Sequence, residues 1–211
     1  GEVLGFLGPN GAGKSTSMQM ITGNLAPTTG QITINGYDLI DQPIEAKSCI
    51  GYLPEHPPLY RDLTVDEYLT YCARLHRIAR AQIKAAVDDV KQHCGLEQVG
   101  QRLIGNLSKG YQQRVGIAQA IIHQPPVVIL DEPTVGLDPI QIREIRHLIK
   151  SLGKDRSVIL STHILPEVQA TCDRVQIIRS GELIYHSSIE ELNQQGQSNL
   201  VKVAFNQPPS V

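Results

Sequence analysis

The residues best suited to chemistry form a short glycine-rich segment near the start of the chain. Its sequence, Gly-Pro-Asn-Gly-Ala-Gly-Lys-Ser-Thr, fits the phosphate-binding pattern G-x-x-x-x-G-K-[S/T]. The glycines let the backbone turn tightly and bring its N–H groups close to a phosphate chain. The lysine can reach the β- and γ-phosphates of a nucleotide, and the serine hydroxyl can bind Mg²⁺. The expected nucleotide-binding residues of this segment are Gly8, Pro9, Asn10, Gly11, Ala12, Gly13, Lys14, Ser15 and Thr16, with Ser15 also a metal ligand.

A second candidate site follows an apolar run in the middle of the chain. Val127–Leu130 is typical of a strand buried on both faces, as in a parallel sheet, and it leads into two carboxylates, Asp131 and Glu132. Asp131 can hold Mg²⁺ through its hydration shell. Glu132, one residue further along, can accept a proton from an attacking water. Beside a phosphate-binding loop, these two carboxylates predict a metal-dependent hydrolytic site.

Strands and helices at defined places must bring these two segments together. The apolar run Val3–Leu7 predicts a strand before the loop, and Lys14–Leu25 is expected to form a helix whose N-terminus adds a partial positive charge. Gln31–Ile34 alternates as a strand does, and Asn35-Gly36 is a strong hairpin signal. Ile50–Leu53 predicts another short strand.

The next part of the chain changes to helical spacing. Thr64 and Glu67 match a capping box, and a helix with an apolar face is expected to follow. Residues 62–104 therefore predict a helical insertion, whose aromatic and cysteine side chains we expect in the core rather than on a cofactor. The second helix of this insertion is expected to place Ile83, Val87, Val90 and Cys94 on one face and to stop at Gly95.

The last third of the chain predicts the remaining elements. Asp138 can N-cap a helix that has Pro139 at its first position. The other expected elements are a buried strand over Ser157–Ser161 that leads to Thr162-His163, a hairpin of Val175–Ile178 and Leu183–Tyr185, a capping box at Ser188–Glu191 and a strand-like stretch at Val201–Phe205.

Composition restricts the class of protein. With 211 residues, of which 41% are hydrophobic and 19% charged, the chain can bury a core and is typical of a soluble globular protein. A net charge of −2 gives no reason to expect a nucleic-acid partner. The four cysteines are scattered without a C-x-x-C pair, so they indicate neither a zinc site nor a disulfide framework. We find no signal peptide and no apolar run of about 18 residues. The first element starts at residue 1 without Met, and the strand-like stretch Val201–Phe205 stops at Pro208–Val211, so we expect a chain cut at both ends.

In their order along the chain, these motifs resemble those of the ATP-binding-cassette (ABC) ATPases, the nucleotide-binding subunits of ABC transporters. Gly8–Thr16 looks like the Walker A motif, and Val127–Glu132 looks like Walker B with the catalytic glutamate. Leu107–Gln112 resembles the signature motif, usually Leu-Ser-Gly-Gly-Gln. Gly136–Asp138 matches the D-loop, and Ser161–His163 matches the switch histidine. Many ATPases and GTPases share Walker A, so the signature motif is what narrows the family.

The resemblance implies roles for further residues. In this family two cassettes pair head to tail and enclose two ATP molecules. Ser108 and the Gly110 backbone would therefore donate hydrogen bonds to the γ-phosphate held by the partner cassette. Glu132 would orient and deprotonate water, His163 would contact the γ-phosphate, and Asp138 would help to link the two sites.

Two places depart from the family pattern. A glutamine that contacts Mg²⁺ and the transmembrane partner usually follows the strand expected at Ile50–Leu53, and here Glu55 takes its place. A carboxylate can still bind Mg²⁺ but adds negative charge beside the phosphates, so we expect a competent site with altered metal or nucleotide affinity. Lys109 and Tyr111 replace Gly and Gln in the signature motif. The stretch Pro54–Tyr60 resembles the gliding-motility and multidrug exporter branch of the family.

The predicted fold is α/β: a P-loop NTPase with a mostly parallel core sheet, a partial antiparallel β-subdomain and an inserted helical subdomain. The predicted division places Walker A and the partial β-subdomain in residues 1–61 and the helical subdomain in 62–104. Residues 105–186 would hold the signature, Walker B and switch histidine, and 187–211 would begin a C-terminal extension.

The predicted function is Mg²⁺-dependent ATP hydrolysis that energises a separate transmembrane permease, with export as the direction. The expected partners are that permease and a second copy of the chain, and the expected place is the cytoplasmic face of the cell membrane. Two alternatives stay open, namely a soluble ABC ATPase acting in translation or DNA maintenance and a nucleotide-gated switch without turnover. The sequence does not indicate the cargo. The family's adenine-stacking aromatic residue lies upstream of the segment present here, so we expect this chain to bind ATP weakly.

Overall fold

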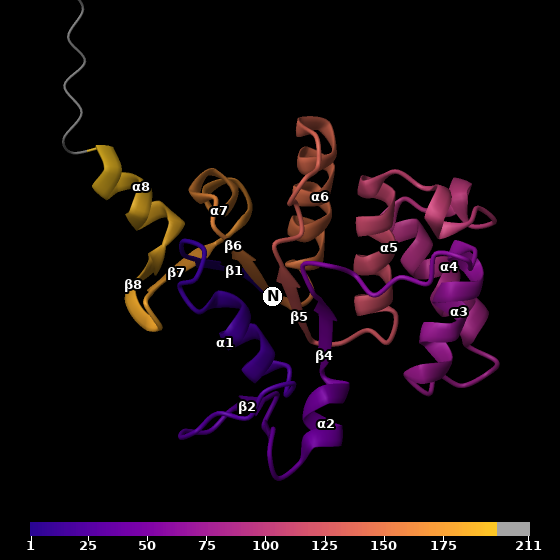
Figure 1. The fold of residues 1–211 in the computed structure, drawn as a ribbon, viewed down its shortest axis with the longest axis horizontal. Coiled ribbons are helices and arrows are strands. Elements are labelled where there is room, and N and C mark those ends of the chain that lie inside the picture. The colour runs from indigo at the N-terminus through magenta and orange to yellow at the C-terminus, as the bar shows by residue number, and fades with distance from the viewer. Residues whose placement is uncertain (198–211) are drawn as a thin grey trace, which may run out of the picture.

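The computed structural model describes residues 1–197 and shows a six-stranded sheet with helices packed on both faces (Figure 1). Neighbouring strands pair in parallel, except that the last two form an antiparallel hairpin. The α/β fold with a mostly parallel sheet that the sequence predicted is therefore confirmed. In sheet order the strands are β4 (Ile50–Leu53), β5 (Val127–Asp131), β6 (Ser157–Thr162), β1 (Glu2–Leu7), β7 (Arg174–Arg179) and β8 (Glu182–Ser188).

The pairing register brings the candidate segments to one edge of the sheet. Leu7, the last residue of β1, pairs with Thr162, the last residue of β6. Asp131, the last residue of β5, pairs with Ser161. The carboxyl ends of parallel strands share an edge, where open α/β sheets bind ligands. The glycine-rich loop and the residues that follow β5 and β6 therefore leave the sheet side by side.

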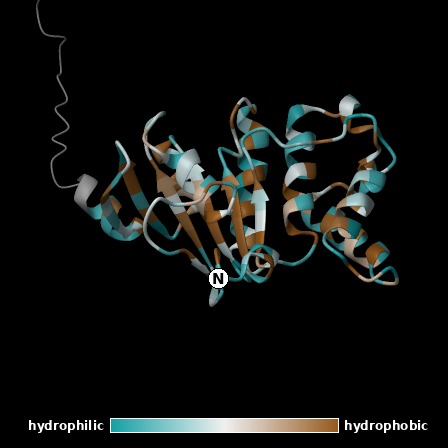
Figure 2. Cartoon of the chain, turned by 60° about the horizontal axis from the view of Figure 1, so that its bottom comes forward, coloured by the Kyte–Doolittle hydropathy of each residue, from teal (hydrophilic) through white to brown (hydrophobic). Residues whose placement is uncertain are grey.

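Alternate side chains of β5 enter two different cores. Ile129 packs in a cluster with Met18 of α1 (Lys14–Ile21) and with Ile50. Val128 and Leu130 belong to the larger cluster on the other side. That cluster includes side chains of α5 (Lys109–Ile121), α6 (Pro139–Leu152) and α7 (Leu165–Thr171). Burial on both faces explains the continuous apolar run in this strand, and Figure 2 shows the hydrophobic central strands between mixed helices.

Residues 62–104 fold as helices at one end of the molecule, beside α5 (Figure 1). The capping box is present, because the Glu67 N–H donates to the Thr64 hydroxyl at 3.2 Å and the Thr64 N–H donates to the Glu67 carboxylate at 2.8 Å. Gly95 adopts a left-handed φ of 64° and ends the second helix as predicted. The elements are α3 (Val65–Leu75), α4 (Ile83–Cys94) and the 3₁₀ turns η1 (Glu97–Val99) and η2 (Ile104–Asn106).

A small separate sheet precedes β4. Its strands β2 (Thr33–Ile34) and β3 (Tyr37–Asp38) pair in antiparallel fashion across Asn35-Gly36, which has positive φ at both positions, as a two-residue hairpin requires. The predicted start of this hairpin at Gln31 was wrong by two residues, since β2 begins at Thr33. The helix α2 (Pro43–Ser48) follows and was not predicted.

The helix predicted to reach Leu25 is shorter, because α1 ends at Ile21. The Thr22 hydroxyl bonds back to the Met18 carbonyl at 2.9 Å, and Gly23 takes a left-handed φ of 71° that turns the chain away. The helix α7 was also not predicted.

The last described element is α8 (Ile189–Gln197). It begins with the predicted capping box, in which the Glu191 N–H donates to the Ser188 hydroxyl at 3.1 Å. The strand-like stretch Val201–Phe205 lies outside the described residues. Among residues 1–197, every helix is too short or too polar to cross a lipid bilayer.

Candidate active site

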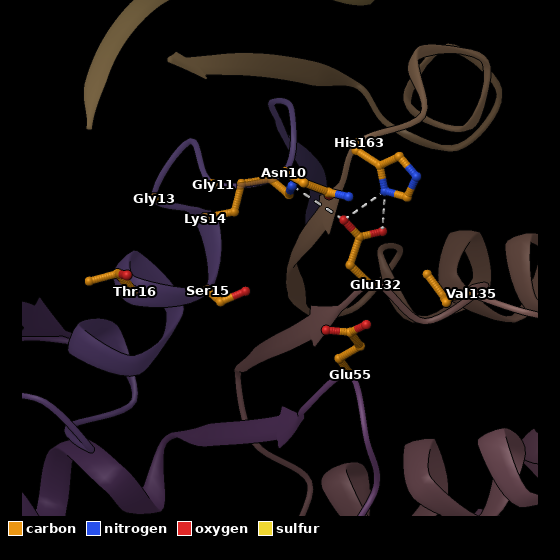
Figure 3. A pocket seen from close by; sticks show the side chains of 10 residues that line it. All are labelled: Asn10, Gly11, Gly13, Lys14, Ser15, Thr16, Glu55, Glu132, Val135 and His163. Atoms are coloured by element: carbon orange, nitrogen blue, oxygen red, sulfur yellow. Dashed lines mark hydrogen bonds and ion pairs between the residues drawn. The ribbon is translucent and has the colours of Figure 1, made fainter. Parts of the chain in front are cut away.

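A pocket of about 400 Å³ opens at the carboxyl edge of the sheet (Figure 3). It collects residues from the glycine-rich loop and from the segments that follow β4, β5 and β6. Its lining is Asn10, Gly11, Gly13, Lys14, Ser15, Thr16, Glu55, Glu132, Val135 and His163. Most predicted nucleotide-binding residues therefore share one cavity.

The glycine-rich loop is held in shape by its backbone. Gly11 and Gly13 have φ of 78° and 107°, values that other residues rarely adopt. A Cβ at Gly8 would lie 2.5 Å from the carbonyl oxygen of Ile178, so only glycine fits against β7. Gly13 N-caps α1 without a side-chain cap, which leaves the first N–H groups of that helix available to an anion.

Lys14 is drawn back into this loop. Its side chain is 6% exposed, and its Nζ donates to the Gly8 carbonyl at 2.9 Å and to the Pro9 carbonyl at 3.4 Å. The same Nζ lies 3.3 Å from Oε1 of Glu132. The Glu132 carboxylate is therefore the countercharge of the buried Lys14 ammonium. It takes the place beside this ammonium that a phosphate group could also take.

Glu132 occupies the centre of the pocket (Figure 3). Both of its carboxylate oxygens lie 3.0 Å from Nδ1 of His163. Its backbone has a left-handed φ of 48°, and its N–H donates to the Ser161 carbonyl at 2.9 Å. Left-handed backbone at a residue other than glycine costs about 1–3 kcal/mol and clusters at functional sites. The turn aims the carboxylate at Lys14 and His163.

Asp131 is the last residue of β5 and does not itself line the pocket. It is 3% exposed, and its Oδ1 has no hydrogen-bond partner within residues 1–197. Burial, followed by the charge of Asp131, raises the pKa of Tyr52. A buried oxygen without a partner is a costly feature that a bound cation would satisfy. With the Ser15 hydroxyl in the pocket, the oxygen donors fit Mg²⁺, which prefers hard oxygen ligands and retains waters.

The other predicted site residues lie outside this cavity. Ser108 N-caps α5, accepting a hydrogen bond from the Tyr111 N–H at 3.4 Å. Gly110 is buried against Gln141, whose side chain would meet any Cβ there. Asp138 N-caps α6 by accepting from the N–H groups of Ile140 and Gln141 at 2.9 Å each. The signature and D-loop segments are therefore in contact with each other but contribute nothing to this pocket's lining.

Two relationships were missed from the sequence. Val135 lines this pocket and a neighbouring cavity of about 200 Å³ that also holds Glu55 and Lys109. The Lys109 ammonium lies where a side chain at Gly136 would be, and Gly136 has a left-handed φ of 71°. The departure at position 109 thus places a cation on the segment that follows Glu132. No local sequence pattern predicts the contacts of Val135 or Lys109, because both contacts join segments that are distant in sequence.

Known proteins with similar sequences carry the same type of domain over most of this chain. The family model described as ABC transporter matches residues 1–135. The ABC transporter ATP-binding protein NatA of Bacillus subtilis (strain 168) is 42% identical over 207 residues, which cover 97% of this chain and 84% of NatA. The bacitracin transport ATP-binding protein BcrA of Bacillus licheniformis is 41% identical over 202 residues, covering 95% of this chain and 65% of BcrA.

Solved structures extend the likeness to three dimensions. The dimeric structure of a post-hydrolysis state of the ATP-binding cassette MJ0796, bound to ADP and phosphate, matches with a TM-score of 0.78 and 25% identity. The match covers 89% of this chain and 85% of that one. The fold therefore agrees with that of a cassette described in a state after hydrolysis.

Proposed function

The chain belongs to the ABC transporter family, and we propose that it is the ATP-hydrolysing subunit of an exporter, energising a separate transmembrane permease. Membership makes it an ATP-binding ABC ATPase with a P-loop fold. The observation that carries the proposal is the convergence of Lys14, Glu132 and His163 in one pocket at the start of α1. At a helix N-terminus a cation can hold the phosphates, a carboxylate can orient water, and an imidazole can donate to the γ-phosphate, which are roles that phosphoryl transfer to water uses.

The proposed reaction starts with an exchange of partners at Lys14. The phosphates of ATP take the place of Glu132 beside the Lys14 ammonium, and the N–H groups at the start of α1 donate to them. The freed Glu132 carboxylate then faces the γ-phosphate and can orient a water. Mg²⁺, when bound at Ser15 and Asp131, supplies positive charge to the β- and γ-phosphates. Glu55 lines the same pocket and is proposed as an additional oxygen near this ion.

The chemical step transfers the γ-phosphoryl group to water. The water oxygen forms a bond to the γ-phosphorus while the bond from that phosphorus to the β,γ-bridging oxygen breaks, and ADP leaves with the bonding electrons. Glu132 accepts the proton that the water loses. His163, which contacts Glu132 in this structure, donates to the γ-phosphate through its ring. The products are ADP and inorganic phosphate.

We further propose that the working unit contains two copies of the chain. Ser108 and Asp138 are exposed at the ends of α5 and α6, outside the pocket of their own chain. A head-to-tail partner would bring its Ser108 hydroxyl and Gly110 backbone to the γ-phosphate, and the likeness to a dimeric cassette supports this arrangement. The division of the chain at residues 61, 104 and 186 remains a prediction of the same proposal.

Similar proteins support three further parts of the proposal. These are the permease partner, export as the direction of transport, and a location at the cytoplasmic face of the membrane. BcrA is described as a bacitracin transport protein, and Pro54–Tyr60 resembles the exporter branch. The test is to purify the full-length protein from gently solubilised membranes of its native cells. A stoichiometric membrane protein with several spans should accompany it, and the complex should release phosphate from ATP. Recovery with ribosomes or DNA would instead favour a soluble ABC ATPase, and ATP binding without phosphate release would favour a switch.

A further inference from the structure

A carboxylate that the proposed reaction does not use lies buried outside the pocket lining. Glu167, in the first turn of α7, is 1% exposed. Its Oε1 accepts a hydrogen bond from the Thr134 hydroxyl at 2.7 Å, and its Oε2 accepts one from the Thr162 hydroxyl at 3.0 Å. Nη2 of Arg146, on α6, lies 3.4 Å from Oε1. A carboxylate stays buried only where hydrogen bonds and a countercharge offset its lost hydration, and Glu167 has both.

The two threonines belong to the segments that carry the two central pocket residues. Thr134 lies two positions after Glu132, in the turn that follows β5. Thr162 is the last residue of β6 and directly precedes His163. The Thr162 hydroxyl also accepts from the Ile164 N–H at 3.2 Å, so one hydroxyl contacts the chain on the far side of the histidine. Glu167 therefore bridges the turn after Glu132 and the strand end before His163.

The pocket side alone cannot hold these segments during the reaction. The contact between Glu132 and His163 is exposed to the pocket. Glu132 has a strained backbone with φ 48°, and the His163 side chain is 39% exposed. A γ-phosphate between the two would replace that contact. The bridge through Glu167 is buried and uses no residue that lines the pocket, so a bound nucleotide would not compete for its hydrogen bonds. A strained backbone persists only where its surroundings fix it, and this bridge supplies that restraint.

We propose that Glu167 is a positioning residue for ATP hydrolysis, holding the Glu132 turn and the His163 strand end at a fixed separation. This inference rests on the proposed function, because it concerns the rate of that reaction. Glu167 does not line the nucleotide pocket. Loss of its hydrogen bonds is therefore expected to lower kcat while the KM for ATP stays within twofold. Misplacement of catalytic groups by about 1 Å is enough to lower a rate by orders of magnitude.

The test uses threonine-to-valine substitutions, which remove one hydroxyl and keep the side-chain shape. Thr134→Val and Thr162→Val each break one hydrogen bond to Glu167. Thr171→Val is the matched control, since Thr171 also lies in α7, is 2% exposed, and its hydroxyl has no hydrogen-bond partner within residues 1–197. Thr134→Ser and Glu167→Gln complete the set. Steady-state phosphate release and thermal unfolding are measured for the full-length protein and each variant.

The expected result is a fall in kcat of at least fivefold for Thr134→Val and Thr162→Val, with recovery in Thr134→Ser. The control Thr171→Val should keep the wild-type kcat. Glu167→Gln should lower kcat further, because its amide cannot accept from both hydroxyls. Equal kcat values in the three valine variants would overturn the proposal. So would a fall in activity that is fully explained by a smaller fraction of folded protein in the thermal unfolding data. A change in KM for ATP with no change in kcat would also overturn it. A wild-type protein that releases no phosphate would instead overturn the proposed function itself.

Discussion

Both carboxylate oxygens of Glu132 lie 3.0 Å from Nδ1 of His163, although 31 residues separate them in the chain. One of these oxygens also lies 3.3 Å from Nζ of Lys14. In this structure the proposed base, Glu132, therefore neutralises Lys14, the residue proposed to bind the phosphates. Binding of ATP must separate this pair, which makes the charge of Glu132 a competitor of the substrate as well as a participant in its hydrolysis.

Replacing Glu132 by glutamine should separate these two effects. Glu132→Gln removes the proton acceptor, so kcat should fall by a factor of about 10²–10⁴, the usual contribution of general acid–base catalysis. The same change removes the negative charge beside Lys14, so the affinity for Mg-ATP should stay the same or increase. Phosphate release and equilibrium nucleotide binding measure the two quantities on the same preparation.

The control for this variant is Glu190→Gln, an exposed glutamate in the first turn of α8. It should change neither quantity. A Glu132→Gln protein that keeps more than a tenth of the wild-type kcat would show that another group accepts the proton. Weaker nucleotide binding in that variant would show that Glu132 does not compete for Lys14.

Glu55 gives a prediction about metal dependence. The carboxylate lines the pocket with Ser15 and Glu132, so removing its charge should reduce the local attraction for Mg²⁺. Glu55→Gln should raise the Mg²⁺ concentration that gives half-maximal ATPase activity several-fold while activity at saturating Mg²⁺ is retained. His56→Gln, in the neighbouring exposed position, is the control. Unchanged Mg²⁺ dependence in Glu55→Gln would remove Glu55 from the proposed metal site.

The strands of the core sheet could be predicted from the sequence because each carries its own signal. Val127–Leu130 is apolar throughout, and the observed burial on both faces follows from that run. The capping box at Thr64 and the hairpin at Asn35-Gly36 were also local patterns and are present. The helix α7 was missed because only 7 residues form it, too few to display a helical period.

The pocket was predicted as a set of motifs but not as a set of contacts. Lys14 and Glu132 stand 118 positions apart (132 − 14), and no local pattern states that their side chains pair. The same holds for Glu167, whose importance depends on two threonines brought beside it by the β5–β6 pairing. Sequence patterns indicate which edge of the sheet carries the chemistry, whereas the partner of each charge depends on side-chain packing.

A stacked histidine pair predicts how stability depends on pH. The rings of His76 and His123 lie parallel, at 5°, with centroids 3.8 Å apart. Burial, followed by the charges of His76 and Arg156, lowers the pKa of His123 to about 4, although its ring contacts the Ile50 carbonyl oxygen at 3.1 Å. The unfolded chain takes up a proton as the pH falls through the ordinary value of 6.5, whereas the folded chain does not do so until about 4.

Stability is therefore expected to fall between pH 6.5 and about 4, by at most about 1.4 kcal/mol per pH unit for this one group. His123→Gln should make the midpoint of thermal unfolding less sensitive to pH in that window than the wild type. The control is His147→Gln, an exposed position on α6. An equal sensitivity in His123→Gln and wild type would show that another group accounts for the acid response.

The contact between β4 and α5 provides a pair of glycines for the last prediction. A Cβ at Gly51 would overlap the backbone carbonyl oxygen of Ala120, which cannot move without displacing α5. For a Cβ at Gly116, in α5 itself, the three nearest atoms belong to the side chains of Leu53 and Pro57. Overpacking typically costs about 1–3 kcal/mol, while alanine gains about 1 kcal/mol over glycine within a helix. Gly51→Ala should therefore lower the midpoint of thermal unfolding by several degrees, and Gly116→Ala should change it much less. Equal midpoints in the two variants would contradict this prediction and would mean that α5 can shift against β4.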